Sequence, residues 1–275
     1  MSQEQISVMI NGLPGKMAGE VLRLLRADER FKIVPFGLTG PKIEPQVYEG
    51  ISLYHQGDLG GNVWQELRDT HPNIIAIDFT QPNAAVNNAR LYYNYGINFV
   101  MGTTGGDSEE LKKLFEGQGV CCAVIAPNMA KPIVLFQAMM EFAADKFPDA
   151  LAEYEGSAEE SHQKGKKDTS GTAKAIIGYL QKLGLKIERI KIIMRRSPLY
   201  QMFILGVPKK YLKGHGWHTY RLISADKTVE LSFTHNVNGR AVYAHGTRDA
   251  VLFLAQKLSE GKTGIAYSML DVLGG

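Results

Sequence analysis

The first half of the chain alternates short apolar runs with helical patterns, and this alternation restricts the possible folds more than any other feature. The runs are nearly all apolar, as expected for strands that are covered on both faces in a parallel sheet. They lie at residues 6–10, 31–38, 73–80, 97–104 and 120–127. The alternation predicts an N-terminal, Rossmann-like, doubly wound parallel sheet of the α/β class.

After residue 130 the pattern changes. Residues 131–147 and 172–183 have the apolar spacing of helices. Strand-like runs separated by glycine-rich turns lie at residues 153–162, 188–196, 220–225 and 228–237. The second part of the chain therefore predicts an α+β domain with a mixed or antiparallel sheet.

The composition argues against several classes of partner. The net charge is only +3, and the basic residues are spread along the chain, so we expect no nucleic-acid partner. The longest apolar stretch, residues 119–144, is interrupted by polar residues, so we expect no membrane span. We expect no signal peptide before the first predicted strand. We expect a cytoplasmic protein, with the plastid stroma as the alternative if a transit peptide has been removed.

The only cysteines, Cys121 and Cys122, are adjacent within a predicted strand. Neighbouring side chains in a strand point to opposite faces, so a disulfide between these two is not expected. We interpret both residues as free thiols in a reducing compartment.

A glycine turn joins the first predicted strand to the helix that follows it. Gly12 and Gly15 let the backbone approach a ligand, and the amides at the helix start suit a pyrophosphate. Pro14 and Ala18 replace two glycines of the usual pattern, so a purely structural turn is the alternative. The position after the first strand of the alternation favours a dinucleotide.

The end of the second predicted strand bears on cofactor choice. It offers Thr39 and Lys42 but no acidic residue before Glu44. A hydroxyl and an ammonium suit a 2′-phosphate, so we predict that NADPH is used at least as well as NADH. The alternative is that Lys42 is a solvated loop charge.

The ends of the next three predicted strands should complete the cofactor edge, because ligands of such sheets bind beyond the carboxyl ends of the strands. We expect Gly102 and Gly105 to leave room for a nicotinamide, with threonine hydroxyls bonding its carboxamide. The strand-end residues are Thr80, Gly102, Thr103, Thr104, Pro127 and Asn128.

Residues 159–174, EESHQKGKKDTSGTAK, are unusually cationic and run into a helix start. The lysines repel one another, so an anionic ligand is expected. Ser170 or Thr172 suits the N-cap, and the amides of Gly171 and Thr172, with the Lys166 ammonium, form a carboxylate site. His162 is suited to supply a proton near neutral pH. A solvated loop followed by an ordinary helix cap is the alternative.

Histidines His215, His218, His235 and His245 raise the question of a metal. No cysteine or acid accompanies them at ligand spacing in the sequence. We interpret residues 214–218 as a turn and expect no metal site.

One long segment, ESHQKGKKDTSGTA at 160–173, resembles the signature of the dihydrodipicolinate reductase family, which acts in the diaminopimelate route to lysine. Shorter matches to the same family are GLPGKM at 12–17, DFT at 78–80, GTTGG at 102–106 and APNM at 126–129. The resemblance covers essentially the whole chain. It is closest to the plant-type branch, which has a glutamine where other members have a second histidine, here Gln163.

The resemblance implies an NAD(P)H-dependent oxidoreductase that reduces a cyclic dicarboxylate imine to tetrahydrodipicolinate. His162 matches the proton donor and Lys166 the catalytic lysine. Substrate contacts are implied for Gln163, Lys166, Ser170, Gly171 and Thr172. We expect cofactor contacts from Gly12, Leu13, Pro14, Gly15, Lys16, Met17, Thr39, Lys42, Phe79, Thr80, Gly102, Thr103, Thr104, Ala126, Pro127, Asn128 and Met129.

The resemblance also implies domain boundaries and assembly. We expect a dinucleotide-binding domain at 1–130 with 250–275, and a domain for substrate binding and oligomerisation at 131–249. A homodimer or homotetramer is implied. Two other functions stay open: a non-enzymatic NAD(P)H-binding regulator, and a semialdehyde dehydrogenase with a cysteine nucleophile.

Overall fold

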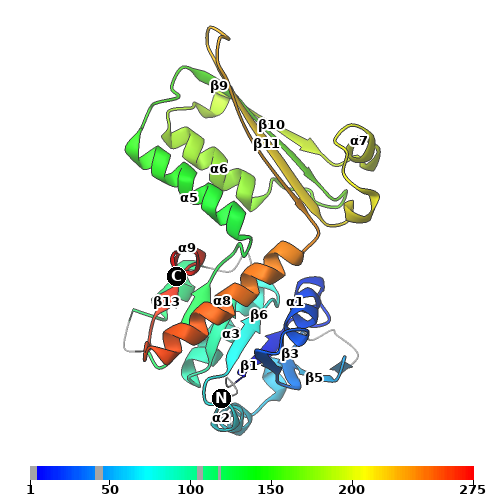
Figure 1. Cartoon of the computed structure of the whole chain (residues 1–275), viewed down its shortest axis with the longest axis vertical. Helices are drawn as coiled ribbons and strands as arrows, with labels where there is room; N and C mark the ends of the chain where they lie inside the picture. The colour runs from blue at the N-terminus through cyan, green and yellow to red at the C-terminus, as the bar shows by residue number, and fades with distance from the viewer. Residues whose placement is uncertain (1–4, 41–45, 104–107, 117–118) are drawn as a thin grey trace. The chain divides into compact units, whose positions relative to one another are not determined.

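A computed structural model describes residues 5–40, 46–103, 108–116 and 119–275 (Figure 1). The chain divides into unit 1, Met1–Lys131 with Ala241–Gly275, and unit 2, Pro132–Arg240. It returns to unit 1 at Ala241 rather than at 250, because helix α8 is continuous over Ala241–Ser259. Lys42, Thr104 and Gly105, which we expected at the cofactor edge, lie outside the described residues.

Unit 1 contains a six-stranded sheet in the order β13-β8-β7-β6-β1-β2, and every pairing is parallel. This sheet confirms the predicted Rossmann-like fold. Its strands are β1 (Ile6–Asn11), β2 (Phe31–Ile33), β6 (Ile75–Asp78), β7 (Asn98–Met101), β8 (Ala123–Ile125) and β13 (Ala266–Tyr267). The last of these, from the C-terminal segment, was not predicted.

The helices of unit 1 fill the connections between strands. Helices α1 and α8 pack against each other, and Tyr92, Phe99 and Trp64 form part of a core between the sheet and the helices. Besides α8, these helices are α1 (Lys16–Arg26), α2 (Gly61–Thr70), α3 (Pro82–Asn94), α4 (Ser108–Lys113) and α9 (Met269–Gly274), with a 3₁₀ turn η1 (Gln56–Asp58).

The run at 31–38, predicted as one strand, is two. Strand β2 ends at Ile33, and β3 (Phe36–Leu38) pairs with β5 (Ile51–Tyr54) in a small separate sheet, whose third strand is β4 (Val47–Tyr48). Pro35 lies at the break. Because proline has no backbone N–H to donate to a ladder, a strand commonly ends or changes partner at such a position.

Unit 2 contains a four-stranded mixed sheet in the order β10-β9-β11-β12, with β10 parallel to β9 and the other pairs antiparallel. The sheet confirms the predicted α+β architecture. Its strands are β9 (Tyr154–His162), β10 (Ile190–Arg195), β11 (His215–Ser224) and β12 (Glu230–Asn238). The helical segments are α5 (Lys131–Lys146), α6 (Gly171–Lys182), η2 (Ile187–Arg189), α7 (Pro198–Phe203) and η3 (Lys209–Tyr211).

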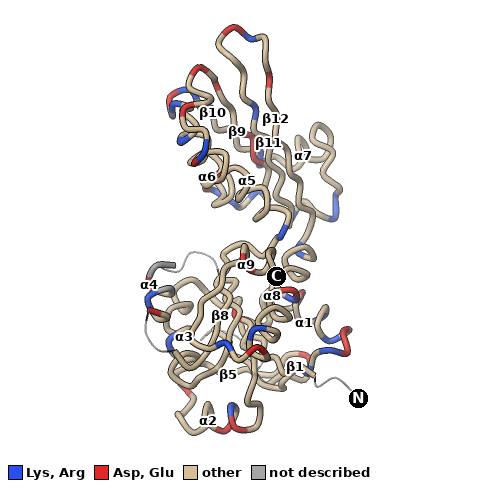
Figure 2. The backbone as a smooth tube through the Cα atoms, turned by 60° about the vertical axis from the view of Figure 1, so that its left-hand side comes forward, with Lys and Arg blue, Asp and Glu red and all other residues tan. Residues whose placement is uncertain are grey.

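The core of unit 2 lies between one face of this sheet and helices α5 and α6. Ala158, Tyr220 and Leu222 from the strands pack with Met140 of α5 and Ile176 of α6. Acidic and basic residues are mixed along both units, without a long basic run (Figure 2). Across the described ranges, no helix combines the length and apolar character that a bilayer crossing would need.

Candidate active site

The predicted pyrophosphate turn lies between β1 and α1. Gly12 has φ of +97°, and a Cβ at this residue would lie 2.3 Å from the carbonyl oxygen of Phe79. A Cβ at Gly15 would lie 2.5 Å from the carbonyl oxygen of Gly12. Only glycine fits at either position, while Gly15 and Lys16 at the helix start are exposed. A tight backbone turn with open helix amides is a cradle that fits a pyrophosphate.

A buried carboxylate organises the strand ends beside this turn. Asp78 accepts hydrogen bonds from the Thr80 backbone N–H (2.9 Å) and hydroxyl (2.6 Å) and from the Thr103 hydroxyl (3.1 Å). It also accepts from Asn88 Nδ2 (2.9 Å) and the Tyr92 hydroxyl (2.7 Å). The hydroxyl protons of both threonines are thus directed to Asp78. Toward a nicotinamide carboxamide these residues would therefore offer hydroxyl lone pairs and backbone groups, and the expected hydroxyl contacts would be as acceptors.

Three other expected cofactor residues contact groups within the protein. The Thr39 hydroxyl donates to the Leu13 carbonyl oxygen at 2.6 Å. A Cβ at Gly102 would lie 2.3 Å from the Phe79 ring, so this ring fills the space that we expected a nicotinamide to use. Asn128 Oδ1 accepts from the Ala130 N–H at 3.0 Å.

The remaining expected cofactor residues differ in how much of them a ligand can reach. The side chains of Leu13, Ala126 and Met129 are buried, so only their backbone groups are available. Lys16 and Pro127 are exposed, and Pro14 and Met17 are partly exposed.

The predicted substrate site lies in unit 2, where β9 ends at His162 and α6 begins at Gly171. Ser170 is the N-cap of α6, and its hydroxyl oxygen accepts from the Ala173 N–H at 3.0 Å. The backbone N–H groups of Gly171 and Thr172 precede the first intrahelical bond. Gly171 is exposed, with open space where a side chain would be. This helix start is therefore available to an anion.

The loop between β9 and α6 carries the lysines of the cationic segment. Gln163, Lys164 and Lys167 are exposed, whereas Lys166 is partly buried. The Lys166 ammonium makes no ion pair with the part of the chain that the structure describes, and its charge lowers the pKa of His162. Lys166 is thus the loop cation that lies electrostatically closest to the histidine.

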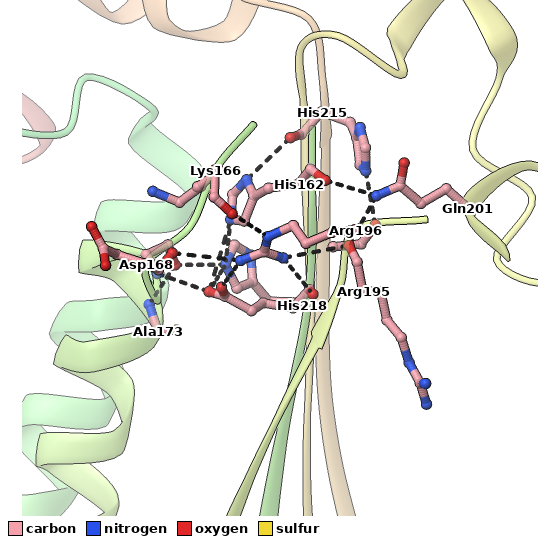
Figure 3. A network of polar contacts seen from close by, with 12 residues as sticks. His162, Lys166, Asp168, Ala173, Arg195, Arg196, Gln201, His215 and His218 are labelled. Atoms are coloured by element: carbon pink, nitrogen blue, oxygen red, sulfur yellow. Dashed lines mark hydrogen bonds and ion pairs between the residues drawn. The ribbon is translucent and has the colours of Figure 1, made fainter. Parts of the chain in front are cut away.

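Arg196, which follows β10, holds this loop in place (Figure 3). Its guanidinium donates to the Lys166 carbonyl oxygen (2.8 Å), the Glu160 carbonyl oxygen (3.1 Å) and the Glu160 carboxylate. Glu160 is 1% exposed. Burial alone would raise the pKa of Glu160, but bonds from Ser170 and Arg196 outweigh it, so its pKa is lowered. A buried, ionised carboxylate paired with Arg196 thus anchors the loop.

His162 lies at the end of β9 with both ring nitrogens engaged. Its Nδ1 is 3.2 Å from the His215 carbonyl oxygen, and its Nε2 is 3.3 Å from His218 Nε2. Burial lowers the pKa of His162 to about 4; Glu160 opposes this shift, and Lys166 and Arg196 add to it. The imidazole is therefore neutral at pH 7.

His218 is a site residue that the sequence did not reveal. Residues 214–218 are not a turn: β11 begins at His215 and pairs with β9 so that His218 lies opposite Glu160. His218 Nε2 lies 2.8 Å from the Ser170 hydroxyl oxygen. Burial, with His235 as the next cause, lowers the pKa of His218 to about 2. The alternation of side chains over residues 215–224 could have revealed the longer strand and His218 on it, but we predicted a strand only from residue 220.

The same pairing brings an acid beside two histidines, contrary to our expectation. Candidate ligand atoms of Glu160, His162 and His218 all lie within 4.8 Å of one another. However, Arg196 and the Ser170 N–H already bind the Glu160 carboxylate. These contacts make the cluster a hydrogen-bonded network next to an anion site, suited to holding a carboxylate and a transferable proton.

Comparisons with known proteins match both units to one family. The family model for the N-terminus of dihydrodipicolinate reductase matches residues 6–129, and the model for its C-terminus matches 132–273. A chloroplastic 4-hydroxy-tetrahydrodipicolinate reductase 2 of Arabidopsis thaliana is 42% identical over 272 residues, 98% of this chain and 77% of the relative. The 4-hydroxy-tetrahydrodipicolinate reductase of Methanocaldococcus jannaschii is 29% identical, covering 98% of this chain and 97% of the relative.

The fold also matches a solved structure. The dipicolinate-bound dihydrodipicolinate reductase from Paenisporosarcina sp. TG-14 superposes with a TM-score of 0.65 at 18% identity, covering 96% of this chain and 98% of that one. The family models together span nearly all of the sequence, and the similarity to the Arabidopsis relative extends over 98% of this chain. The chain belongs to the dihydrodipicolinate reductase family.

Proposed function

We infer that the protein is an NAD(P)H-dependent 4-hydroxy-tetrahydrodipicolinate reductase of the diaminopimelate route to lysine. It reduces a cyclic imine that carries two carboxylates to tetrahydrodipicolinate. The family and the names of its relatives support this activity. The observation that supports the roles of individual residues is the position of His162 and Lys166 beside the open start of α6.

Unit 1 would hold the cofactor. Its turn at Gly12 and Gly15 and the amides that open α1 fit a pyrophosphate. A side chain at either glycine would clash with a backbone carbonyl oxygen and distort this turn. The strand ends at Thr80, Thr103 and Asn128 complete the same edge of the sheet. When bound, the reduced nicotinamide supplies the hydride.

Lys166 and the start of α6 would hold the substrate. One carboxylate accepts hydrogen bonds from the Gly171 and Thr172 N–H groups, and the Lys166 ammonium offsets its charge. A second carboxylate on the ring explains why the loop carries further lysines. Gln163 is exposed and uncharged, so its contribution to this site is a hydrogen bond.

His162 would provide the proton that completes the reduction. Addition of hydride leaves an enamine-like anion, whose carbon must be protonated. The free ring is neutral, because burial and two nearby cations disfavour its charged form. A bound dicarboxylate offsets those cations and favours the imidazolium. The acid is thus charged when substrate is present.

The test is consumption of NADPH in the presence of freshly generated 4-hydroxy-tetrahydrodipicolinate. We expect steady consumption that depends on this intermediate, and its near loss in a His162→Ala variant. Failure of the unmodified protein to consume NADPH or NADH would contradict the proposal. Such a protein would instead fit the non-enzymatic NAD(P)H-binding regulator.

We propose that NADPH is used at least as well as NADH. The Thr39 hydroxyl proton is given to Leu13, so the proposal depends on the Lys42 ammonium. A Lys42→Ala variant should lose preference for NADPH, measured as the ratio of the two Michaelis constants. An unchanged ratio would remove Lys42 from the explanation.

The two cysteines of the chain do not support the alternative function, a semialdehyde dehydrogenase with a cysteine nucleophile. Both cysteines are buried and free. Burial raises the pKa of Cys121 to about 12, and it also raises the pKa of Cys122. A nucleophilic cysteine needs a lowered pKa and access to substrate. These two residues are suited to packing, and free thiols are consistent with the cytoplasm or the plastid stroma that we propose as the location.

We propose that copies of the chain associate as a homodimer or homotetramer through unit 2. Helix α7 bears Leu199 and Phe203, which are 66% and 74% exposed, and Ile204 beside them is 67% exposed. Ile204 also lines a groove of about 230 Å³ with Trp217 and Thr219 on the sheet. Sedimentation of the unmodified chain and of Phe203→Glu tests this: a monomer in both cases would contradict it.

A further inference from the structure

While the His162 ring is neutral, the hydrogen bonds around it allow one arrangement of protons. A carbonyl oxygen only accepts, so His162 Nδ1, 3.2 Å from the His215 oxygen, carries the hydrogen. The neutral ring then has a lone pair at Nε2. Since two facing lone pairs repel, His218 Nε2, at 3.3 Å, carries a hydrogen and donates it.

The same His218 N–H reaches Ser170. His218 Nε2 lies 2.8 Å from the Ser170 hydroxyl oxygen, which also accepts from the Ala173 N–H. The Ser170 hydroxyl proton is directed to Glu160, whose pKa this bond lowers. Every donor along the path from His162 to Glu160 thus has an acceptor.

We propose that His218 is a positioning residue for the proton donor: its Nε2 holds the Nε2 of His162 and connects it to Ser170, the N-cap of the helix that binds the substrate carboxylate. The inference rests on the proposed function. The inference means that His218 holds both Ser170, the N-cap of the helix, and His162, the proton donor.

The pair has a second, balanced arrangement. When His162 carries a proton on Nε2, that N–H donates to His218, which presents a lone pair at Nε2 and carries its hydrogen at Nδ1. Between the two arrangements the pair takes up one proton, released by a hydronium ion of the solvent, so that His162 carries two ring hydrogens and His218 keeps one. His218 Nδ1 is buried and has no hydrogen-bond partner within the described part of the chain, so this second tautomer leaves an N–H without an acceptor and is the less stable of the two.

Several charged or titratable groups surround the pair from the neighbouring elements, and the His218 variants leave all of them unchanged. They are Glu160 on β9, Lys166 in the loop, Arg196 after β10, His215 and Tyr220 on β11, and His235 on β12. His235 stacks on His218 with ring centroids 4.6 Å apart. This stacking makes His235→Phe the matched control, since phenylalanine keeps a stacked ring.

The experiment compares His218→Phe and His218→Gln with the control in the full chain. In His218→Phe we expect kcat to fall about 10- to 100-fold, the range for losing one hydrogen bond to a group that becomes charged. The KM for NADPH should stay within about twofold, because the cofactor cradle is in unit 1. The glutamine amide can present either an N–H or a carbonyl, so His218→Gln should recover part of kcat. His235→Phe should stay close to the unmodified protein.

Nitrogen NMR of labelled histidines gives a readout that needs no turnover. In the unmodified protein we expect His162 to be neutral with hydrogen on Nδ1 and a hydrogen-bonded Nε2. His218→Phe should remove the signature of that bond. Unchanged kcat, pH profile and Nε2 signal in His218→Phe would overturn the inference, and if that variant does not fold, the same outcome in His218→Leu, which also lacks the hydrogen bond, would do so. Failure of the unmodified protein to turn over substrate would instead overturn the proposed function.

Discussion

At the scale of single residues, the site depends on groups whose protonation the fold controls. His162 has a pKa lowered to about 4, His218 to about 2 and His235 to about 4, with burial as the main cause in each. Between these values and the ordinary pKa of histidine, the unfolded chain binds protons that the folded chain does not. Stability therefore rises with pH in that window and falls on acidification.

The first prediction follows from this linkage. Lowering the pH from about 6.5 toward 5 should reduce the free energy of unfolding by up to about 1.4 kcal/mol per pH unit for each of these histidines. Urea unfolding at several pH values measures it. His235→Phe removes one titrating ring and should make the dependence shallower. An equally steep dependence in that variant would contradict the assignment to His235.

The second prediction separates the loop lysines. Lys166→Ala should lower kcat about 10²- to 10⁴-fold, the range for a group that stabilises charge or transfers a proton, while cofactor binding persists. Lys167→Ala is the control: Lys167 is exposed, so its removal should leave kcat nearly unchanged and affect only the KM for the dicarboxylate. Steady-state kinetics of the two variants test this prediction, and fluorescence measures their binding of NADPH. Equal losses in both would favour a diffuse cationic field over a defined role for Lys166.

At the scale of elements, two neighbouring arginines show how the burial of an ion pair beside a sheet affects its contribution to the stability of the protein. Arg196 pairs with Glu160, and the two side chains are 16% and 1% exposed. Arg195 pairs with Glu159 at 33% and 27% exposure, and its side chain points away from the network (Figure 3). Removing one partner of a buried pair leaves an uncompensated charge, whereas an accessible pair is screened by water.

The third prediction uses this contrast. Arg196→Met should lower the free energy of unfolding by about 3 kcal/mol, and it should raise the KM for substrate because the 163–169 loop loses its anchor. Arg195→Met should cost about 1 kcal/mol or less. Chemical denaturation and kinetics measure both effects. A larger loss in Arg195→Met would mean that the anchor is on the other face of the sheet.

The elements also show what the sequence can and cannot reveal. The parallel sheet was predictable because each strand and helix has its own local period, and the glycine turn was predictable because it follows the first strand. His218 and Arg196 were not assigned, since their partners depend on the register between β9, β10 and β11, which lie far apart in the chain. Gln201 was missed for the same reason: it donates to the His162 carbonyl oxygen at 2.7 Å from α7.

At the scale of the whole molecule, a cofactor that binds only the folded protein should stabilise it by mass action. Unit 1 contains both the turn expected to hold the dinucleotide and the two buried thiols. Because Cys121 and Cys122 are buried with raised pKa values, they react with a thiol reagent only when unit 1 opens. Their labelling rate therefore reports the population of the opened unit.

The last prediction relates the glycine turn at Gly12 and Gly15 to the rate at which the two cysteines are labelled. Native protein should react slowly with iodoacetamide and keep its activity, and NADPH at about 100 times its dissociation constant should slow labelling about 100-fold. Gly12→Ala should abolish this protection, since its Cβ would meet the Phe79 carbonyl oxygen at 2.3 Å. Gly57→Ala, where a Cβ meets nothing within 4 Å, is the control and should keep the protection. Full protection in Gly12→Ala would show that the dinucleotide is held elsewhere, because a turn distorted by that clash can no longer close around a pyrophosphate.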